Sequence, residues 1–342
     1  TDDDGKYTLL HGHYDSWDVG VGDNATGDAC MLEIARLLNE NKSNLKRSVK
    51  IAWWPGHSTG RYAGSTWYAD NFAIDLNNNC IAQVNCDSPG CRWADTFDHL
   101  SVMTEAEGYV HRVIKEIANV EPICERPHRA GDYAFNNIGL SSFFMLSSTM
   151  PQKLREEKNY YAVGGCGGNI AWHTENDQME IADKDNLERD IKVYAGSIIE
   201  LSNCEYLPFD WLNTTKEFRN TLNSYQKNSG VHFDVEPSLK KLNEFEIKLT
   251  NFYEKINNKT IESLNANQII MEMARILIPL NFARNPRFTH DPAVPIPPLP
   301  TLSLCDEISL IPKDLIGFAQ TQLVRGQNRF IANIDQAIVL LG

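Results

Sequence analysis

Residues 9–27, LLHGHYDSWDVGVGDNATG, constrain the fold of this chain more than any other stretch. They begin with an apolar run that is typical of the end of a buried strand. The strand delivers His11, His13 and Asp15 into a loop rich in glycine and aspartate, and a helical pattern follows over residues 29–38. Open α/β sheets bind ligands at the carboxyl ends of their strands, beside the start of a helix. This stretch therefore predicts an α/β domain with a polar site at this place.

The residue types in this loop favour a divalent metal ion as the ligand. His13 and Asp23 offer the nitrogen and oxygen atoms that zinc and similar ions bind. Asp15, two residues after His13, is placed to orient that imidazole. The alternative is a polar loop in which Asp23 and Asn24 cap the next helix, and this stretch alone does not decide between the two. The glycosylation-like triplet at residues 24–26 lies inside the expected site, so we interpret it as a chance match.

Length and charge limit the classes of protein to which the chain can belong. Its 342 residues exceed a usual single domain, so we expect two domains. The formal net charge of -13 argues against nucleic acid and anionic membrane surfaces as partners. No apolar run has the length of a membrane span.

The hydrophobic pattern divides the chain near residue 206. Before that point, short apolar runs alternate with helical stretches, the rhythm of a layered α/β domain. Among the strands predicted there are residues 48–54, 80–85 and 139–146. Residues 1–206 are expected to form an α/β domain with a mixed, mostly parallel sheet flanked by helices. Residues 207–342 show helical spacing interrupted by a proline-rich segment, and are expected to form a helical domain.

Further ligand-type residues follow apolar runs or a glycine-rich loop in the same domain. His57 follows the strand predicted at residues 48–54, Asp87 follows the next strand, and His173 follows a loop of four glycines. Taken singly, Asp87 is equally a turn residue, and His173 a hydrogen-bonded loop histidine. Metal sites are nevertheless assembled in this way from side chains distant in sequence. Together with the first loop, these residues predict a metal site.

Four stretches of the chain resemble a known family. HGHYDSWDVGVGDNATG, NCDSPG, HRAGDYAFNNIGLSS and WHTENDQ resemble the successive motifs of the co-catalytic zinc aminopeptidases. That family also includes glutamate carboxypeptidase II and the transferrin-receptor-like proteins. The resemblance covers most of residues 7–200. The helical region, with its FTHDPAVPIPPLPTL stretch, is similar to the dimerisation domain of the larger members.

The resemblance implies a binuclear zinc site that cleaves a peptide or amide bond. It implies that His13 and Asp87 hold one ion, that His173 holds the other, and that Asp23 bridges both. In this family the metals polarise the scissile carbonyl and activate water, and a carboxylate accepts the proton.

The sequence departs from the family at one place. The family carries two adjacent glutamates after the strand that here ends at Trp54, the first a general base and the second a metal ligand. This chain has PGHSTGRYAGS there, with neither glutamate and one extra residue. Counting from Trp54 puts His57 at the base position and Ser58 at the ligand position, whereas counting back from Gly64 shifts both by one. Three roles of His57 stay open: a metal ligand, which we favour, a general base, or a remnant in a chain that has lost the chemistry.

Five further residues are expected near the metals. Arg61 and Tyr62 are expected to bind a substrate carboxylate or stabilise an oxyanion, unless Arg61 forms a structural ion pair. Arg129 and Asp132 belong to the HRAGD motif, which resembles a loop that lines the family's cleft; a helix cap at Asp132 is the alternative. By the same resemblance, Asp177 is a carboxylate behind the ligands.

We therefore expect a metal-dependent hydrolase that cleaves a peptide-like or other amide bond in a small substrate, with one or two zinc ions. Two alternatives stay open. One is a non-catalytic, receptor-like relative that binds metal but has lost the general base. The other is a hydrolase of a different C–N bond, such as a ureido group or a cyclic amide.

The sequence also suggests an assembly and a compartment. The helical domain is expected to form a homodimer through apolar side chains such as Phe245, Phe252, Ile270 and Met273. The eight cysteines show no CxxC pair, so we expect free thiols. The chain starts with Thr and shows no signal peptide, so we expect that an upstream part precedes it. The N-terminus leaves the localisation unknown, and a cytoplasmic one is favoured.

Overall fold

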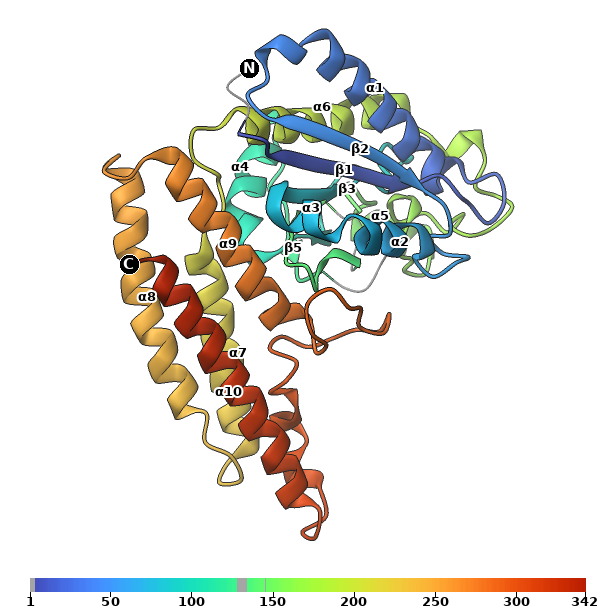
Figure 1. Cartoon of the computed structure of the whole chain (residues 1–342). Helices are drawn as coiled ribbons and strands as arrows, with labels where there is room; N and C mark the ends of the chain where they lie inside the picture. The colour runs from blue at the N-terminus through green and yellow to red at the C-terminus, as the bar shows by residue number, and fades with distance from the viewer. Residues whose placement is uncertain (1–3, 128–133, 145) are drawn as a thin grey trace. The chain divides into compact units, whose positions relative to one another are not determined.

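The computed structural model of the chain describes residues 4–127, 134–144 and 146–342 (Figure 1). The chain divides into two compact units. The first comprises Thr1–Phe135 and Leu140–Cys204, and the second comprises Asn136–Gly139 and Glu205–Gly342. Among the helices of the described ranges, none combines the length and the apolarity that crossing a bilayer requires.

The first unit is built around a four-stranded parallel sheet with the strand order β2-β1-β3-β6. These strands are β1 Tyr7–His13, β2 Ser48–Trp54, β3 Cys80–Asn85 and β6 Ser141–Phe143. The predicted bounds of β2 and β3 are confirmed, whereas β6 is shorter than the strand predicted at residues 139–146. The expected α/β class with a sheet flanked by helices is confirmed.

Within the described residues of this unit there are also six α-helices and a short strand pair. The helices are α1 Thr26–Glu40, α2 Ala63–Asn71, α3 Ala73–Asn79, α4 Glu107–Ala118, α5 Gln152–Glu157 and α6 Lys184–Asn203. The pair consists of β4 Leu100–Ser101 and β5 Cys124–Glu125, which run parallel. Helices α1 and α6 contact each other, and both contact β1 and β2 (Figure 1).

The position of β1 decides where a ligand site can form. This strand lies between β2 and β3, and all seven of its residues are buried, as expected of a central parallel strand. The chain runs from β1 to β2 on one side and continues to β3 on the other. The loops that leave β1 and β3 therefore diverge at their carboxyl ends, which is the place where open α/β sheets bind ligands.

A buried carboxylate on α6 fixes the loop that follows β3. The Oδ2 atom of Asp190 accepts hydrogen bonds from the backbone N–H of Gly90 at 2.8 Å and from the Ser148 hydroxyl at 2.5 Å. Its Oδ1 atom pairs with the Arg189 guanidinium at 2.8 Å, and Asp190 itself is fully buried. One carboxylate thus joins α6 to the loop after β3 and to the segment after β6.

We expect Asp190→Ala to lower the free energy of unfolding by about 3–5 kcal/mol, because it removes the carboxylate that pairs with Arg189 and leaves two buried donors without their acceptor. Glu188→Ala is the control, since it removes an exposed ion pair with Lys192 on the same helix and should change the stability little. Urea unfolding followed by circular dichroism measures both variants. Similar losses in the two variants would contradict the anchoring role.

The second unit consists of four long helices and the segments that join them. The helices are α7 Trp211–Ser229, α8 Glu236–Asn257, α9 Ser263–Phe282 and α10 Ile316–Leu340. Helix α8 contacts α7 and α10, and α10 also contacts α9. The proline-rich residues 291–300 form neither helix nor strand, as their sequence predicts. Asp291 accepts a hydrogen bond from the backbone N–H of Arg284 at 3.1 Å, which fixes the start of this segment.

The apolar side chains expected at a dimer interface are buried within the chain itself. Phe245 and Met273 are 0% exposed, Ile270 is 1% exposed and Phe252 is 3% exposed. The expectation that these four side chains contact a partner is wrong, because helical spacing identifies an apolar face but not what covers it. A homodimer through residues 207–342 stays a prediction.

Candidate metal centre

Five side chains predicted as metal ligands lie together at the carboxyl edge of the sheet. His13 is the last residue of β1, and Asp87 follows β3. Asp23 lies in the turn before α1, His57 in the loop after β2, and His173 in the loop before α6. The structure brings together all five residues that the sequence analysis selected as ligands.

Neighbouring donor atoms of these side chains lie 3.0–3.9 Å apart. The Nε2 atom of His13 lies 3.0 Å from Asp23 Oδ1 and 3.6 Å from Asp87 Oδ2. The other Asp23 oxygen, Oδ2, lies 3.0 Å from Nε2 of His173. The Nε2 atom of His57 lies 3.9 Å from Asp87 Oδ2. Asp23 therefore stands between two histidines, in the position that a bridging carboxylate requires.

The hydrogen bonds of His13 fix which of its nitrogens faces this cluster. Its Nδ1 lies 2.8 Å from the backbone carbonyl of Asp15. Because a carbonyl oxygen only accepts, the proton is on Nδ1 and the lone pair of the neutral ring is on Nε2. That buried nitrogen has no hydrogen-bond partner and faces two carboxylates. In the neutral ring this lone pair faces two anionic oxygens, an arrangement that a bound cation would stabilise, so the residues fit a metal ion.

Electrostatics supports the same conclusion. Burial lowers the pKa of His13, but the neighbouring carboxylates of Asp23 and Asp87 outweigh this effect and raise the pKa to about 11. Burial also raises the pKa of Asp23, but the imidazoles of His13 and His173 hold that pKa below its ordinary value. The two carboxylates thus demand a positive charge, and a divalent ion supplies it in place of a proton. Imidazole nitrogens and carboxylate oxygens are ligands that suit zinc.

His57 lies against His13. The two imidazole rings are stacked, with centroids 4.0 Å apart and an interplanar angle of 9°. Burial and the neighbouring His13 lower the pKa of His57 to about 4, so the ring is neutral at neutral pH. The carboxylate of Asp15 accepts the backbone N–H of His57 at 3.1 Å. Asp15 therefore meets His13 most closely through its backbone carbonyl, while its carboxylate, 3.7 Å from His13 Nδ1, positions the His57 loop.

His173 has a different set of neighbours. Its ring stacks on Trp172 at a centroid distance of 3.8 Å, and Trp17 lies 5.7 Å away. Ser58 Oγ lies 3.4 Å from His173 Nε2. His57 thus adjoins the cluster of His13 and Asp87, and Ser58 adjoins His173. This arrangement corresponds to the count that starts from Trp54.

A second carboxylate fixes the turn that carries Asp23. Asp177 is 2% exposed, and its two oxygens accept the backbone N–H groups of Gly22 at 2.6 Å and Asp23 at 3.0 Å. The Cys166 thiol also lies 3.4 Å from Asp177. A hydrogen bond to Cys91 and burial raise the pKa of Cys166, so this thiol is not activated as a nucleophile.

Asn24 holds the two strand ends together. Its amide nitrogen donates to the backbone carbonyls of His13 at 3.1 Å and Cys86 at 3.0 Å. Its amide oxygen accepts the backbone N–H of Ser88 at 2.9 Å. Asn24 is 2% exposed, which agrees with the interpretation of the glycosylation-like triplet as a chance match. Nothing in one sequence distinguishes this asparagine from another loop asparagine, so its structural role was not predicted.

The structure describes two of the four residues expected to bind substrate, Arg61 and Tyr62. Tyr62 packs its ring edge-on against His57, with centroids 5.2 Å apart, and Arg61 donates to the Tyr62 hydroxyl at 3.1 Å. Arg129 and Asp132, expected at the cleft, lie outside the described residues.

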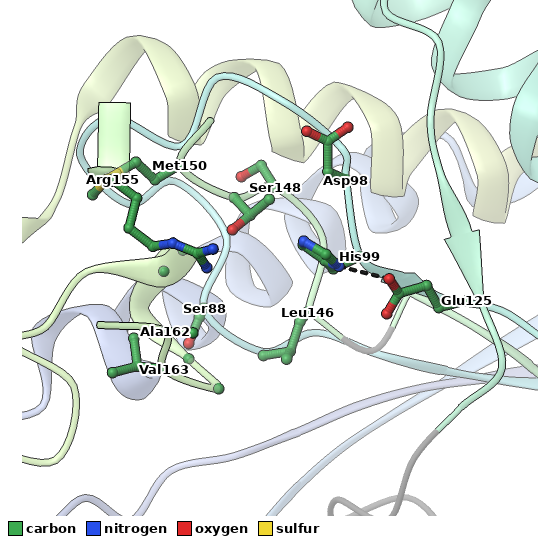
Figure 2. Close-up of a pocket in the computed structure, with 15 residues that line it drawn as sticks. Ser88, Asp98, His99, Glu125, Leu146, Ser148, Met150, Arg155, Ala162 and Val163 are labelled. Atoms are coloured by element: carbon green, nitrogen blue, oxygen red, sulfur yellow. Dashed lines mark hydrogen bonds and ion pairs between the residues drawn. The ribbon is translucent and has the colours of Figure 1, made fainter. Parts of the chain in front are cut away.

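A cavity of about 240 Å³ is lined in part by Ser88, the residue that follows Asp87. The Ser88 hydroxyl donates to the Asp87 carboxylate at 2.9 Å. Residues of the glycine-rich loop and of the segments after β3 and β6 complete the walls. Figure 2 shows Arg155 pointing into this cavity, and His99 bonded to Glu125 at 2.6 Å. Arg155 was not predicted from the sequence, because nothing in the sequence places α5 near the strand ends.

Comparison with known proteins gives matches to one family. Residues 1–197 match the model described as peptidase family M28. The curated protein "Probable glutamate carboxypeptidase VP8" of Zea mays is 32% identical over 85 residues, which are 24% of this chain and 12% of that protein. "Aminopeptidase NAALADL1" of Mus musculus is 33% identical over 86 residues, 24% of this chain and 11% of that protein. The matched stretch thus spans a small part of each relative.

A solved structure resembles part of the chain as well. The crystal structure of LapB from Legionella pneumophila matches with a TM-score of 0.50 and 18% sequence identity, and the match covers 59% of this chain and 54% of that one. Because the sequence identity is 18%, this likeness supports the fold alone.

We expect Asn24→Asp to weaken zinc binding about 10- to 100-fold, the range found when a group that orients a metal ligand is removed. The change keeps the shape of the side chain but replaces its two donated hydrogen bonds with an oxygen facing two carbonyls. Asn39→Asp, on the exposed side of α1, adds the same charge and should leave the affinity unchanged. Calorimetric zinc titration measures both. Equal affinities of Asn24→Asp and wild type would contradict this role.

Proposed function

The chain belongs to peptidase family M28, and from that premise we propose that it is a metal-dependent hydrolase of a peptide-like or other amide bond in a small substrate. One observation carries the proposal: the buried Nε2 lone pair of His13 faces the carboxylates of Asp23 and Asp87. His57 and His173 add two further imidazoles at the edges of this cluster.

These five side chains are the groups that would hold zinc. A zinc ion bound there supplies electrophilic stabilisation of the scissile carbonyl and lowers the pKa of the attacking water. The chain's own residues position the substrate beside that ion. Trp17, which is 54% exposed, and the half-buried Trp172 flank His173 and offer apolar surface to the substrate. Tyr62 beside His57 offers a hydroxyl for the developing oxyanion.

The charge of the cluster favours metal binding, because burying two carboxylates without a matching cation costs several kcal/mol per ion. An enzyme and a metal-binding, receptor-like relative share this feature, so turnover is what separates them. A receptor-like function stays the alternative, because His57 and Ser58 stand where, by resemblance, the family carries its two glutamates. A hydrolase of a non-peptide C–N bond differs only in substrate, and the same assay separates it.

We expect the zinc-loaded protein to hydrolyse at least one class in a panel of dipeptides with a free amino group, N-acylated dipeptides, ureido compounds and cyclic amides. Treatment with 1,10-phenanthroline should abolish turnover, and added zinc should restore it. His13→Ala should lower kcat/KM more than about 100-fold, since loss of a ligand costs more than loss of the group that orients it. His111→Ala on α4 lies outside the cluster and should behave as wild type.

Two results would contradict this proposal in different ways. Zinc binding without turnover on any substrate would support the receptor-like function. Turnover that survives both phenanthroline and His13→Ala would exclude metal dependence.

A further inference from the structure

We propose that the two metal positions of this chain are unequal, with one strong position and one weak position. The strong position has four buried donor side chains, His13, His57, Asp87 and Asp23. The weak position has Asp23, His173 and the hydroxyl of Ser58. This inference rests on the metal binding proposed above and adds which side chains hold which ion.

The strong position gains a ligand that the family arrangement does not have there. One donor atom from each of His13, His57 and Asp87 lies within 4.8 Å of the other two, and all three residues are buried. The two imidazole rings are stacked with centroids 4.0 Å apart, so His57 lies directly beside His13. Asp23, 3.0 Å from His13, completes four nitrogen and oxygen donors, the number that zinc prefers.

The weak position loses a ligand. His173 Nε2 lies 3.0 Å from Asp23 and 3.4 Å from Ser58 Oγ. By resemblance, a glutamate stands in the family at the place that Ser58 occupies by the count from Trp54. A neutral hydroxyl is a poorer zinc ligand than a carboxylate, because zinc sites are built from thiolate, imidazole and carboxylate groups. The His173 side chain is also 27% exposed, so water competes for this position.

The charge balance of the site also predicts one strong and one weak metal position. Asp23 and Asp87 are the only carboxylates among the five proposed ligands, so one divalent ion neutralises the set. A second ion would leave two uncompensated positive charges in a partly buried site, where like charges repel strongly. Two glutamates at residues 57 and 58 would remove that excess, and the chain has a histidine and a serine instead.

The test measures metal content without any assay of turnover. The zinc-loaded protein is dialysed against buffers of increasing chelator strength and its zinc is measured by mass spectrometry. We expect one equivalent to remain after the other is lost. Ser58→Glu should retain a second equivalent at chelator strengths that strip it from wild type, whereas the neutral isostere Ser58→Gln should not. His57→Ala should weaken the retained ion at least about tenfold, while Asn39→Ala changes neither ion.

Each outcome tests a different part of the proposal on the two metal positions. Simultaneous loss of two equivalents from wild type would overturn the inequality. A Ser58→Glu protein that behaves like Ser58→Gln would show that residue 58 is not at the weak position. A folded His57→Ala protein with unchanged affinity would remove His57 from the strong position. None of these results depends on hydrolysis, so the proposed function stands or falls separately.

A second inference rests on the cavity that Ser88 lines. We propose that Arg155 of α5 binds a carboxylate of the substrate in this cavity, which deepens the proposed function by naming a substrate class. Arg155 is half-buried, and none of the described residues forms a side-chain ion pair or hydrogen bond with its guanidinium. Figure 2 shows the guanidinium pointing into the cavity, with the carboxylate of Asp98 directed away from it.

The other charged groups of the cavity leave this guanidinium available. The Nδ1 atom of His99 is hydrogen-bonded to the Glu125 carboxylate at 2.6 Å. Ser88 lines the cavity and bonds to Asp87, so the cavity reaches to within one residue of a proposed ligand. A volume of about 240 Å³ accommodates a short acidic group. An arginine fork binds such a carboxylate through charge-assisted hydrogen bonds.

Three small probes identify the carboxylate by calorimetric binding to the zinc-loaded protein. Glutamate carries both carboxylates, isoglutamine keeps only the side-chain carboxylate, and glutamine keeps only the α-carboxylate. Arg155→Gln should weaken glutamate binding roughly 10- to 100-fold, the worth of a hydrogen bond to a charged group. Arg155→Lys should retain part of the affinity. Lys153→Gln, whose side chain on the same helix is 89% exposed, should have no effect.

The probes distinguish the possible answers. Loss of affinity for isoglutamine but not glutamine assigns an acidic side chain, and the reverse assigns the terminal carboxylate. Equal binding of all three probes by wild type and Arg155→Gln would overturn the inference, whether or not the protein hydrolyses any amide.

Discussion

The lone pair of His13 Nε2, turned toward two buried carboxylates, is the constraint on which the first unit depends. The backbone carbonyl of Asp15 takes the proton of the other ring nitrogen, so this lone pair cannot turn away without losing a hydrogen bond. Asp23 and Asp87 are 6% exposed each, so water screens them poorly. A positive charge, either a proton on His13 or a bound metal ion, must therefore lie among these groups. Binding of an ion there would be linked to the stability of the surrounding loops, because the folded chain would bind the ion better than the unfolded chain.

The residues that make this arrangement possible act mainly on the backbone. Asn24, Asp177 and Asp190 each form hydrogen bonds with main-chain N–H or carbonyl groups of the loops that carry the proposed ligands. Asp190 also binds the side chains of Ser148 and Arg189. Such a frame holds donor atoms within a fraction of an ångström, which a metal site requires. Close approach also explains one glycine of the loop. A Cβ atom on Gly27 would lie 2.2 Å from the amide oxygen of Asn24, so a larger residue would displace that side chain.

Much of the first unit follows from its sequence, because a buried parallel strand reads as an apolar run that ends at a turn. The bounds of β2 and β3 and the five histidines and aspartates were found in this way. The same signal predicts a β6 strand that is too long, because apolar residues continue beyond the last residue that pairs with β3. Spacing along the chain shows which residues reach the site but not which atom each presents. Asp15 illustrates this limit, since its carbonyl faces His13 and its carboxylate faces His57. The neighbours of Phe245 and the role of Asn24 depend on residues distant in sequence, which a single sequence does not pair.

By resemblance, the family carries two glutamates where this chain has His57 and Ser58, and this difference bears on how a substrate would be recognised. The chain carries a net charge of -13, which repels anions at long range. At physiological salt that repulsion is screened beyond roughly 8 Å, so recognition of an anionic group depends on charges inside the site. A centre with fewer carboxylates has less negative charge to oppose such a group once a divalent ion is bound. The guanidinium of Arg155 in the adjoining cavity adds a second positive charge. The proposed centre and the position of Arg155 would therefore act in the same direction, toward a substrate whose negative charge is bound locally in the cavity that Ser88 lines.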